Sequence, residues 1–330
     1  MTVLRVAALA AVLLGAIPAQ TLRFAVIGDS GAGDANQLAV ARQMEMFHVE
    51  HPWTLVLMLG DNIYEEGHPQ EFDRRFKNVY RNLTSRGVRF HAVLGNHDRV
   101  HPLSRKGMAQ VEDEAFGYVG RQDEYELAAG PKVDGRDLVR FMALNSEAWL
   151  EEIDAGGRPE ARLRRLRAWL AESDRYHWNF VLLHHPLYSF VAGKSRFFGL
   201  FRGGYGHGPE EEFRRILEPE LKGKVDAVFS GHEHFYQKIR PQGGIHYFIS
   251  GGGSKIRKGA VKKHEQVEFA AEALHFLDIE LSASALRYTA ISGRGAPLHA
   301  GTIPKKQQQS EVRSQNVAAP APSVGFYSDF

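Results

Sequence analysis

The sequence predicts an α/β domain whose strands form one mixed sheet or two packed sheets. Three observations lead to this class. Strand-like apolar runs alternate with amphipathic helical segments over most of the chain, the last part holds strand-like runs without helices, and several of the apolar runs end in clusters of acidic, amide and imidazole side chains. With 330 residues and 43% hydrophobic content, the chain can bury a large core, as one domain or two.

The first twenty residues have the pattern of a secretory signal peptide. Arg5 precedes an apolar run from Val6 to Ile17, and small residues follow, which places cleavage near Ala19. The run is shorter than the roughly 20 residues that a membrane-spanning helix needs. We therefore expect a secreted or periplasmic mature protein without stable membrane insertion. An uncleaved anchor and a buried N-terminal element are the alternatives.

Strands and helices then follow one another in order. The segment 35–51 predicts a helix with Leu38, Ala41, Met44 and Phe47 along one side, and two later helices have a proline at their start. The last three strands are expected to be antiparallel. The predicted strands are 22–28, 54–60, 88–95, 137–144, 179–184, 225–231, 245–251, 274–281 and 285–291, and the predicted helices are 35–51, 70–83, 159–173 and 209–221.

Composition and charge exclude several kinds of protein. The formal net charge of +2 gives no indication of a nucleic-acid partner. The chain has no cysteine, which excludes disulfides, thiolate catalysis and cysteine-bound zinc. No internal repeat or interdomain linker stands out, so residues 21–303 are interpreted as one domain. Residues 304–330 are polar and rich in Pro, Ala and Gln, and we expect this tail to be disordered.

Five polar clusters stand where predicted strands end. In an α/β sheet, ligands bind in the crevice outside the carboxyl ends of the strands, so these clusters are expected to face one place. A lone Asp or His after a strand usually caps a turn, but five such clusters together would be costly to desolvate without a cation. The clusters are GDSG with Asp29, GDNIY with Asp61 and Tyr64, GNHD with Asn96 and His97, VLLHH with His184 and His185, and GHEH with His232 and His234.

A metal centre supplies the missing positive charge. Carboxylate, amide and imidazole groups suit first-row metals of intermediate hardness. His232 and His234 would lie on the same side of an extended segment and could face two neighbouring metals. Glycine precedes four of the clusters and allows a sharp turn below the ligand. Six candidate side chains are too many for one tetrahedral ion, whereas two ions that share Asp61 use them all. The six are Asp29, Asp61, Asn96, His184, His232 and His234.

Taken in order, the motifs D-x-G, G-D-x-x-Y, G-N-H-D, V-x-x-H and G-H-x-H resemble those of the calcineurin-like metallophosphoesterase superfamily. The tyrosine in the second motif is similar to that of the purple acid phosphatases, especially their small, single-domain, tartrate-resistant type. The motifs extend from Asp29 to His234. This resemblance implies a four-layer αββα sandwich with two mixed β-sheets and a dinuclear metal site between the sheet ends.

The resemblance also implies which residues bind each metal. A hard Fe(III) ion suits a phenolate ligand and would lower the pKa of the Tyr64 phenol below its free value of roughly 10. The alternative is a tyrosine that packs its ring and bonds its hydroxyl locally. The resemblance assigns Asp29, Asp61, Tyr64 and His234 to the ferric ion, and Asp61, Asn96, His184 and His232 to a divalent ion, which can be iron, zinc or manganese.

Other polar residues are expected around the metal ligands. His97 resembles the family's histidine that contacts the substrate phosphate, although a structural hydrogen bond is the alternative. Asp98 is expected to orient a ligand imidazole, and His185 to pack outside the ligands. His207, in HGP, resembles the family segment with a proposed acid for the leaving group, although a longer run precedes it here. Residues 188–206 are expected to form either a substrate lid or a long surface loop.

We therefore expect a secreted acid phosphatase that hydrolyses small phosphomonoesters by attack of a metal-bound hydroxide, with His97 binding phosphate and His207 or a water protonating the leaving group. The nearest alternative is a phosphodiesterase or nucleotidase on the same metal core. A non-catalytic binding protein with this fold is a further alternative, but every motif ligand is present. The sequence leaves the substrate, the divalent metal, the pH optimum and the oligomeric state open.

Overall fold

A computed structural model describes residues 20–98, 106–192, 196–197, 200–201, 207–208 and 210–305. The expected signal peptide and nearly all of the expected tail lie outside the described residues, as does most of the run from residue 193 to residue 206. None of the helices in the described ranges is both long and apolar enough to cross a membrane.

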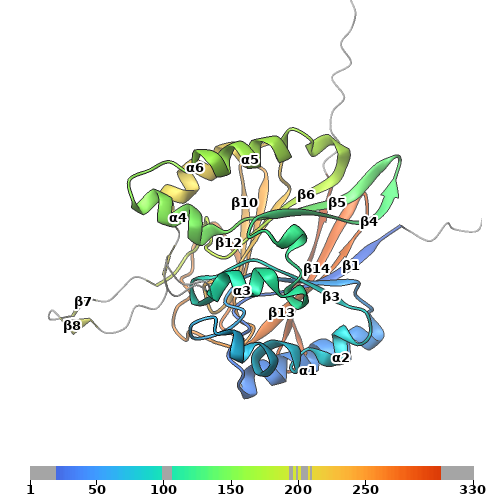
Figure 1. The fold of residues 1–330 in the computed structure, drawn as a ribbon, viewed down its shortest axis with the longest axis vertical. Helices are drawn as coiled ribbons and strands as arrows, with labels where there is room; N and C mark the ends of the chain where they lie inside the picture. The colour runs from blue at the N-terminus through green and yellow to red at the C-terminus, as the bar shows by residue number, and fades with distance from the viewer. Residues whose placement is uncertain are drawn as a thin grey trace, which may run out of the picture.

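Two mixed sheets pack face to face in the centre of the molecule (Figure 1). The first has the order β15-β14-β13-β1-β2-β3, and the second has the order β12-β10-β11-β9-β6-β5-β4. A separate pair of short strands, β7 and β8, forms a small ribbon. The first sheet contains β1 (Leu22–Ile27), β2 (Leu55–Met58), β3 (Arg89–Ala92), β13 (His275–Leu281), β14 (Ala285–Ser292) and β15 (Pro297–Pro304). The remaining strands are β4 (Tyr125–Val133), β5 (Arg136–Ala143), β6 (Tyr176–Leu183), β7 (Arg196–Phe197), β8 (Leu200–Phe201), β9 (Ala227–Ser230), β10 (Tyr236–Gln242), β11 (Ile245–Ser250) and β12 (Val267–Ala271).

Helices cover the outer faces of the two sheets. In Figure 1, α4, α5 and α6 lie on one side of the sandwich, and α1 and α2 lie on the other. This arrangement confirms the predicted four-layer αββα class. The helices are α1 (Ala35–Glu50), α2 (Arg81–Thr84), α3 (Lys106–Glu112), α4 (Ser146–Asp154), α5 (Glu160–Leu170) and α6 (Glu211–Leu221), with short helical turns at Pro69–Glu71, Asp73–Lys77, Asn96–Asp98, Glu114–Phe116, Val119–Arg121 and Ser173–Arg175.

Two apolar cores hold the layers together, and β6 shows how one strand serves both. Phe180 and Leu182 belong to the core between the sheets. Val181 and Leu183 belong to the core between the second sheet and its helices. This alternation is the period of two that a strand imposes on its side chains. A strand buried on both faces appears in the sequence as an unbroken apolar run, as residues 180–183 do.

Three local predictions are wrong in detail. Leu38 of α1 is 52% exposed, and the buried face is formed by Val40, Ala41, Met44 and neighbouring polar residues. The segment 70–83 is not one helix but a chain of short turns that ends in α2. The strand β11 pairs antiparallel with β10 but parallel with β9, so the last part of the chain is not wholly antiparallel.

Candidate metal centre

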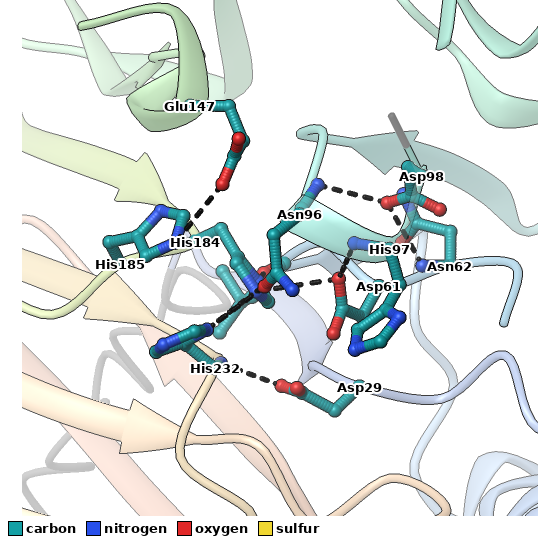
Figure 2. A network of polar contacts seen from close by, with 12 residues as sticks. Asp29, Asp61, Asn62, Asn96, His97, Asp98, Glu147, His184, His185 and His232 are labelled. Atoms are coloured by element: carbon teal, nitrogen blue, oxygen red, sulfur yellow. Dashed lines mark hydrogen bonds and ion pairs between the residues drawn. The ribbon is translucent and has the colours of Figure 1, made fainter. Parts of the chain in front are cut away.

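The five predicted clusters lie at the carboxyl ends of parallel strands, as the sequence predicts. β1, β2 and β3 are parallel neighbours in the first sheet, and β6 and β9 are parallel neighbours in the second. The loops that follow these strands meet where the two sheets end. Figure 2 shows the side chains of Asp29, Asp61, Asn96, His184 and His232 gathered at this place.

The backbone is strained at the candidate ligands themselves. Asp29, Asp61 and His232 have φ angles of 55°, 52° and 69°, in a left-handed region that only a few per cent of non-glycine residues adopt. The predicted role of the preceding glycines as turn formers holds only for Gly60, whose φ is 88°. Gly231 instead allows a close approach, since a Cβ atom there would lie 2.7 Å from Asp29 Oδ2. Because its φ is 69°, His232 does not lie in an extended segment, which was the assumption behind placing His232 and His234 on the same side of the chain.

One group of donor atoms converges around Tyr64. The Tyr64 hydroxyl lies 3.1 Å from Asp29 Oδ1 and 3.2 Å from His234 Nε2. His234 Nε2 lies 3.3 Å from the same Asp29 oxygen. Asp29, Asp61 and His234 together form a cluster whose ligand atoms all lie within 4.8 Å of one another. Burial, with the Asp29 and Asp61 carboxylates, raises the pKa of Tyr64 well above its usual value of 10, so the phenol is neutral unless a cation displaces its proton.

A second group converges around Asn96. The Asn96 Oδ1 atom lies 3.0 Å from His184 Nε2 and 3.1 Å from His232 Nδ1, and these two imidazole nitrogens are 3.2 Å apart. Asp61 Oδ1 lies 3.4 Å from His184 Nε2, so Asp61 stands between the two groups. The imidazoles of His232 and His234 thus reach different groups, as the sequence predicts for two neighbouring metals.

These spacings fit cation coordination. Ligands about 2.1 Å from a metal are separated by roughly 3.0–3.4 Å along the edges of an octahedron or a tetrahedron, and the donor distances in both groups fall in this range. Asp29 and Asp61 are fully buried, and their ion-pair partners within the described part of the chain are imidazoles rather than lysine or arginine. Two buried carboxylates, a phenol and several imidazoles are a donor set that needs positive charge.

The protonation pattern of the imidazoles also suits ligation. His184 Nδ1 lies 2.8 Å from the Leu59 carbonyl oxygen and donates its proton there, which leaves a lone pair on Nε2 facing Asn96. Burial, followed by the neighbouring imidazole of His185, lowers the pKa of His232 well below 6.5. His232 therefore presents the neutral form that binds metals. For His184, burial lowers the pKa, but the Asp61 and Asp29 carboxylates raise the pKa above 6.5 overall, so a cation that binds there takes the place of a proton.

His185 lies next to the second group, since one of its ring nitrogens is within 4.8 Å of ligand nitrogens of His184 and His232, but both of its ring nitrogens have other partners. Its Nδ1 atom lies 3.0 Å from the Ser146 hydroxyl, and its Nε2 atom lies 3.2 Å from Glu147 Oε1. The same Ser146 hydroxyl accepts from the backbone N–H groups of His184 and His185, so the start of α4 fixes the turn after β6. Figure 2 shows His185 directed toward Glu147. These contacts favour the outer position predicted for His185, although its distance from His184 and His232 also places it within reach of the second group.

Asp98 has a different role from the predicted one. Among the described residues, its hydrogen-bond donors are backbone and side-chain amides rather than imidazoles, and it joins two ligand loops through their backbone. Its carboxylate accepts from the N–H groups of Gly95, Asn62 and Ile63, at 2.9, 3.1 and 2.9 Å. The side chains of Asn62 and Gln110 donate to it as well. Asp98 thus ties the loop with Asp61 to the loop with Asn96 (Figure 2).

His97 lies beside the donor groups with part of its ring exposed. Its backbone N–H donates to Asp61 Oδ1 at 2.9 Å, and its Nδ1 atom donates to the Glu65 carbonyl oxygen at 2.9 Å. The ring centroid is 4.7 Å from that of Tyr64. The Nε2 atom has no hydrogen bond within the described residues, so it can contact a ligand that enters the centre. Because Nδ1 holds a proton, Nε2 accepts in the neutral ring and donates only when the ring carries a second proton.

His207 packs against His232, with ring centroids 4.2 Å apart and the ring planes tilted by 38°. The long run before His207 lies largely outside the described residues. Its Nε2 atom is 2.8 Å from the Arg257 guanidinium and therefore accepts a hydrogen bond. Partial burial, with the Arg257 charge, lowers the pKa of His207 to about 4. His207 is therefore near the centre, as predicted, but it is neutral above about pH 4.

Sequence reasoning missed three charged residues at this place. Glu233, between the two histidines of GHEH, accepts from the backbone N–H groups of His207 and Gly208 and so fixes the position of the HGP segment. Lys255 and Arg257 follow β11, whose carboxyl end lies at the same edge because β11 is parallel to β9. The glycine run at 251–253, directly after a predicted strand, was the signal in the sequence that could have drawn attention to Lys255 and Arg257. Its spacing, however, does not match a phosphate-binding loop.

Curated proteins with similar sequences are phosphatases. The chain is 26% identical over 310 residues to purple acid phosphatase 7 of Arabidopsis thaliana, with 87% of each chain covered. It is 24% identical over 331 residues to the human tartrate-resistant acid phosphatase type 5, covering 88% of this chain and 93% of that protein.

Solved structures show the same fold. The purple acid phosphatase PPD1 from yellow lupin seeds superposes with a TM-score of 0.67 at 16% identity, covering 94% of this chain and 58% of that one. GAP50, the anchor in the inner membrane complex of Plasmodium, superposes with a TM-score of 0.71 at 18% identity, covering 88% of this chain and 90% of that one.

The profile of the calcineurin-like phosphoesterase family matches residues 22–236, which include all five polar clusters and the strands that position them. The ordered motifs, the two-sheet sandwich and the similarity to purple and tartrate-resistant acid phosphatases agree with this match. The chain belongs to the calcineurin-like phosphoesterase family.

Proposed function

We propose that this protein is a dinuclear metal-dependent phosphatase that hydrolyses phosphomonoesters. The observation that carries the proposal is the presence of two groups of donor atoms with coordination-like spacing, joined by Asp61. The sequence similarity to purple acid phosphatases supports the phosphatase assignment, and the donor chemistry supports two metals.

The proposed ligand set follows the two groups. Asp29, Asp61, Tyr64 and His234 would hold one ion, and Asp61, Asn96, His184 and His232 would hold the other. The phenol and two carboxylates make the first group the harder one, which favours Fe(III) there and a divalent iron, zinc or manganese ion in the second. When bound, such a pair neutralises the charge of a phosphate and lowers the pKa of a water molecule.

The remaining residues of the centre bind, orient and supply protons. His97 is held by Glu65 and by its own backbone hydrogen bond to Asp61, which leaves Nε2 available for a phosphate oxygen. His207 can protonate a leaving oxygen only when the hydrogen bond from Arg257 is broken and the ring is protonated. Because its pKa is about 4, this contribution is confined to acid pH.

A second function on the same centre is phosphodiester hydrolysis. Tyr64, the residue that sets the purple acid phosphatases apart in the sequence motifs, favours the monoesterase. Rates on para-nitrophenyl phosphate and on bis-para-nitrophenyl phosphate distinguish the two, and we expect the monoester to be hydrolysed at least tenfold faster.

The proposal is tested by metal dependence in wild-type protein and in two variants. The chelated protein should be inactive and should regain activity with iron plus zinc or manganese. Asp61→Asn should lose both metals and activity, because Asp61 stands between the two donor groups. Asp73→Asn is the matched control, since Asp73 carries the same charge on the exposed turn after Pro69–Glu71. A chelated protein that retained full activity, or an Asp61→Asn protein with two tightly bound metals, would contradict the proposal.

We also propose that residues 1–20 are a cleaved signal peptide, so that the mature protein acts outside the cytoplasm. The basis is the charge and apolar pattern of that segment. Expression in the native host followed by mass spectrometry of the secreted or periplasmic fraction should give an N-terminus near residue 20, and an intact Met1 in the cytoplasmic fraction alone would contradict this assignment.

A further inference from the structure

The loop after β11 is held against the first donor group by a hydroxyl and by a close backbone approach. The Ser254 hydroxyl donates a hydrogen bond to the carbonyl oxygen of Asp29. A Cβ atom at Gly251 would lie 2.7 Å from Asp29 Oδ2, which is closer than side-chain carbons approach other atoms, so glycine is required there. Lys255, the residue after Ser254, is therefore fixed beside the group that contains Asp29 and Tyr64.

The Lys255 side chain lies over the face of the Tyr64 ring. Its ammonium group is 3.5 Å from the ring centroid, well within the range of a cation–π contact. The ammonium group also pairs with Glu65 at 3.1 Å, and the Glu65 side chain is 65% exposed, whereas Tyr64 is 1% exposed. Solvent screens the exposed carboxylate more than it screens the buried ring. Glu65 therefore holds the ammonium group in place but offsets only part of its charge at the ring.

The other charges that face Tyr64 are negative. The Tyr64 hydroxyl lies 3.1 Å from Asp29 Oδ1, and burial, with the Asp29 and Asp61 carboxylates, raises the pKa of Tyr64. Within the described residues, Lys255 is the cation that lies over this ring. A cation is attracted by a neutral aromatic face and much more strongly by a ring that carries a full negative charge. The position of Lys255 is therefore most favourable when Tyr64 is a phenolate, the form that binds a metal.

This placement makes Lys255 part of the electronic environment of the metal centre. Resting on the proposed ligation of Fe(III) by Tyr64, we infer that Lys255 is a positioning residue that acts through Tyr64: its charge holds electron density on the phenolate ring and reduces the density that the ring donates to the ion. An ion that receives less density accepts an electron more readily, and a nearby positive charge favours the less positive Fe(II) state. Lys255 thus shifts the Fe(III)/Fe(II) equilibrium toward Fe(II), and this role needs no contact with substrate.

The visible band of the iron-loaded protein measures this effect directly. Absorption of light moves an electron from the phenolate to the ion, away from the ammonium group, so Lys255 raises the energy of the transition. Lys255→Met removes the charge and keeps an unbranched side chain, and it should move the band to longer wavelength by about 10–30 nm, the order expected from Coulomb's law for one charge 3.5 Å from the ring. Lys255→Gln, a second neutral variant, should give the same shift. Lys255→Arg keeps the charge and should leave the band within about 5 nm of wild type.

The reduction potential gives a second readout that a purely structural role would not move. In a redox titration with dithionite and a mediator, one electron converts Fe(III) to Fe(II), and the iron of Lys255→Met should be reduced at a lower potential than that of wild type. Lys255→Arg should keep the wild-type potential. An unchanged or higher potential in Lys255→Met would contradict the inferred effect on the ion.

Two control variants separate the charge over the ring from other effects. Lys258→Met removes a charge from the same segment, but Lys258 is exposed and the cation over the Tyr64 ring is Lys255, so the band should stay in place. Glu65→Gln removes the carboxylate partner while the ammonium charge remains, so the band should stay in place or move to shorter wavelength. If Lys255 served only to anchor Glu65, Glu65→Gln would move the band as Lys255→Met does. Iron content and circular dichroism establish that the variants compared are folded and iron-replete.

The outcomes distinguish this inference from the proposed function. An unshifted band in folded, iron-replete Lys255→Met, a shift to shorter wavelength, or an equal shift in Lys258→Met would overturn the inference while the ferric ligand stands. A wild-type protein that hydrolyses phosphomonoesters but shows no visible band with iron would overturn both the ferric ligand and the role of Lys255, and the phosphatase would stand. A band that shifts as expected in a protein that hydrolyses no phosphate ester would retain the role of Lys255 and contradict the phosphatase proposal.

Discussion

Replacing Asp98 with alanine should both destabilise the fold and weaken metal binding, because Asp98 joins the loops that present Asp61 and Asn96. The Asp98 side chain is fully buried and accepts three backbone hydrogen bonds, from Gly95, Asn62 and Ile63. Alanine leaves these three N–H groups without a partner. An unsatisfied buried donor costs about 1–3 kcal/mol, so the range is about 3–9 kcal/mol before relaxation.

Water entering the vacated space would recover part of this cost. We therefore expect Asp98→Ala to lower the free energy of unfolding by about 3–5 kcal/mol, a large fraction of the 5–15 kcal/mol typical of a domain. Burial, followed by the Asp61 carboxylate, raises the pKa of Asp98 to about 6, so the charged form itself is not strongly favoured. Asp98→Asn keeps the shape but turns one acceptor into a donor that faces a backbone N–H, and it should lie between wild type and Asp98→Ala.

Urea denaturation of the metal-free proteins measures the structural effect, and a metal titration measures the affinity, which should fall by about 10–100-fold. Asp34→Ala is the control, since Asp34 accepts a single backbone hydrogen bond at the start of α1 and its loss should cost about 1 kcal/mol without affecting metals. If Asp98 acted on a ligand imidazole, metal affinity would fall while metal-free stability stayed within 1 kcal/mol of wild type. That result would refute the loop-joining role.

Three further changes test other parts of the centre and the fold. Tyr64→Phe should remove the visible absorption band of the iron-loaded protein while the circular dichroism of the fold is retained; a folded, iron-replete variant that kept the band would exclude a phenolate ligand. His207→Ala should slow hydrolysis of alkyl phosphates more than aryl phosphates, most clearly near pH 4 and less as pH rises, because the pKa of His207 is lowered to about 4; equal losses at every pH would argue against proton donation. Lys238→Met should raise stability at pH 7 by about 1–3 kcal/mol, because burial lowers the pKa of Lys238 to about 8 and the charged form is disfavoured in the fold. This gain should disappear above about pH 10.5, where Lys238 is neutral in both the folded and the unfolded chain. An equal gain in denaturation curves at pH 7 and at pH 11 would show that the charge of Lys238 is not the cause.

The convergence of the site was predictable from the sequence because it depends on chain direction. Parallel strands end at the same sheet edge, so the Asp residues after β1 and β2 must meet if the strand order permits it, and so must the imidazoles after β6 and β9. The alternation of β6 side chains between the two cores and the capping of α1 by Asp34 follow from local rules in the same way. The exposed position of Leu38 does not follow from them, because the buried face of α1 includes the polar residues Gln37 and His48, whose side chains form hydrogen bonds with backbone groups.

The features that sequence-based prediction missed or misplaced depend on backbone geometry and on long-range contacts. Asp98 faces the N–H groups of its neighbouring loop rather than an imidazole, and no sequence period specifies this. His232 adopts φ 69°, so its side chain does not follow the alternation of an extended segment. Lys255 and Arg257 become visible only once β11 is known to run parallel to β9, because a chain end of apparently antiparallel strands would place them elsewhere.

The presence of two metals held by one shared carboxylate is the central claim of this account. Anomalous diffraction from crystals of the iron- and zinc-loaded protein, collected on both sides of each absorption edge, locates and identifies the ions directly. We predict two ions per chain, about 3.5–4 Å apart, with Asp61 between them, iron beside Tyr64 and the second ion beside His184. A single ion, or two ions that do not share Asp61, in a protein that hydrolyses phosphomonoesters would contradict the account.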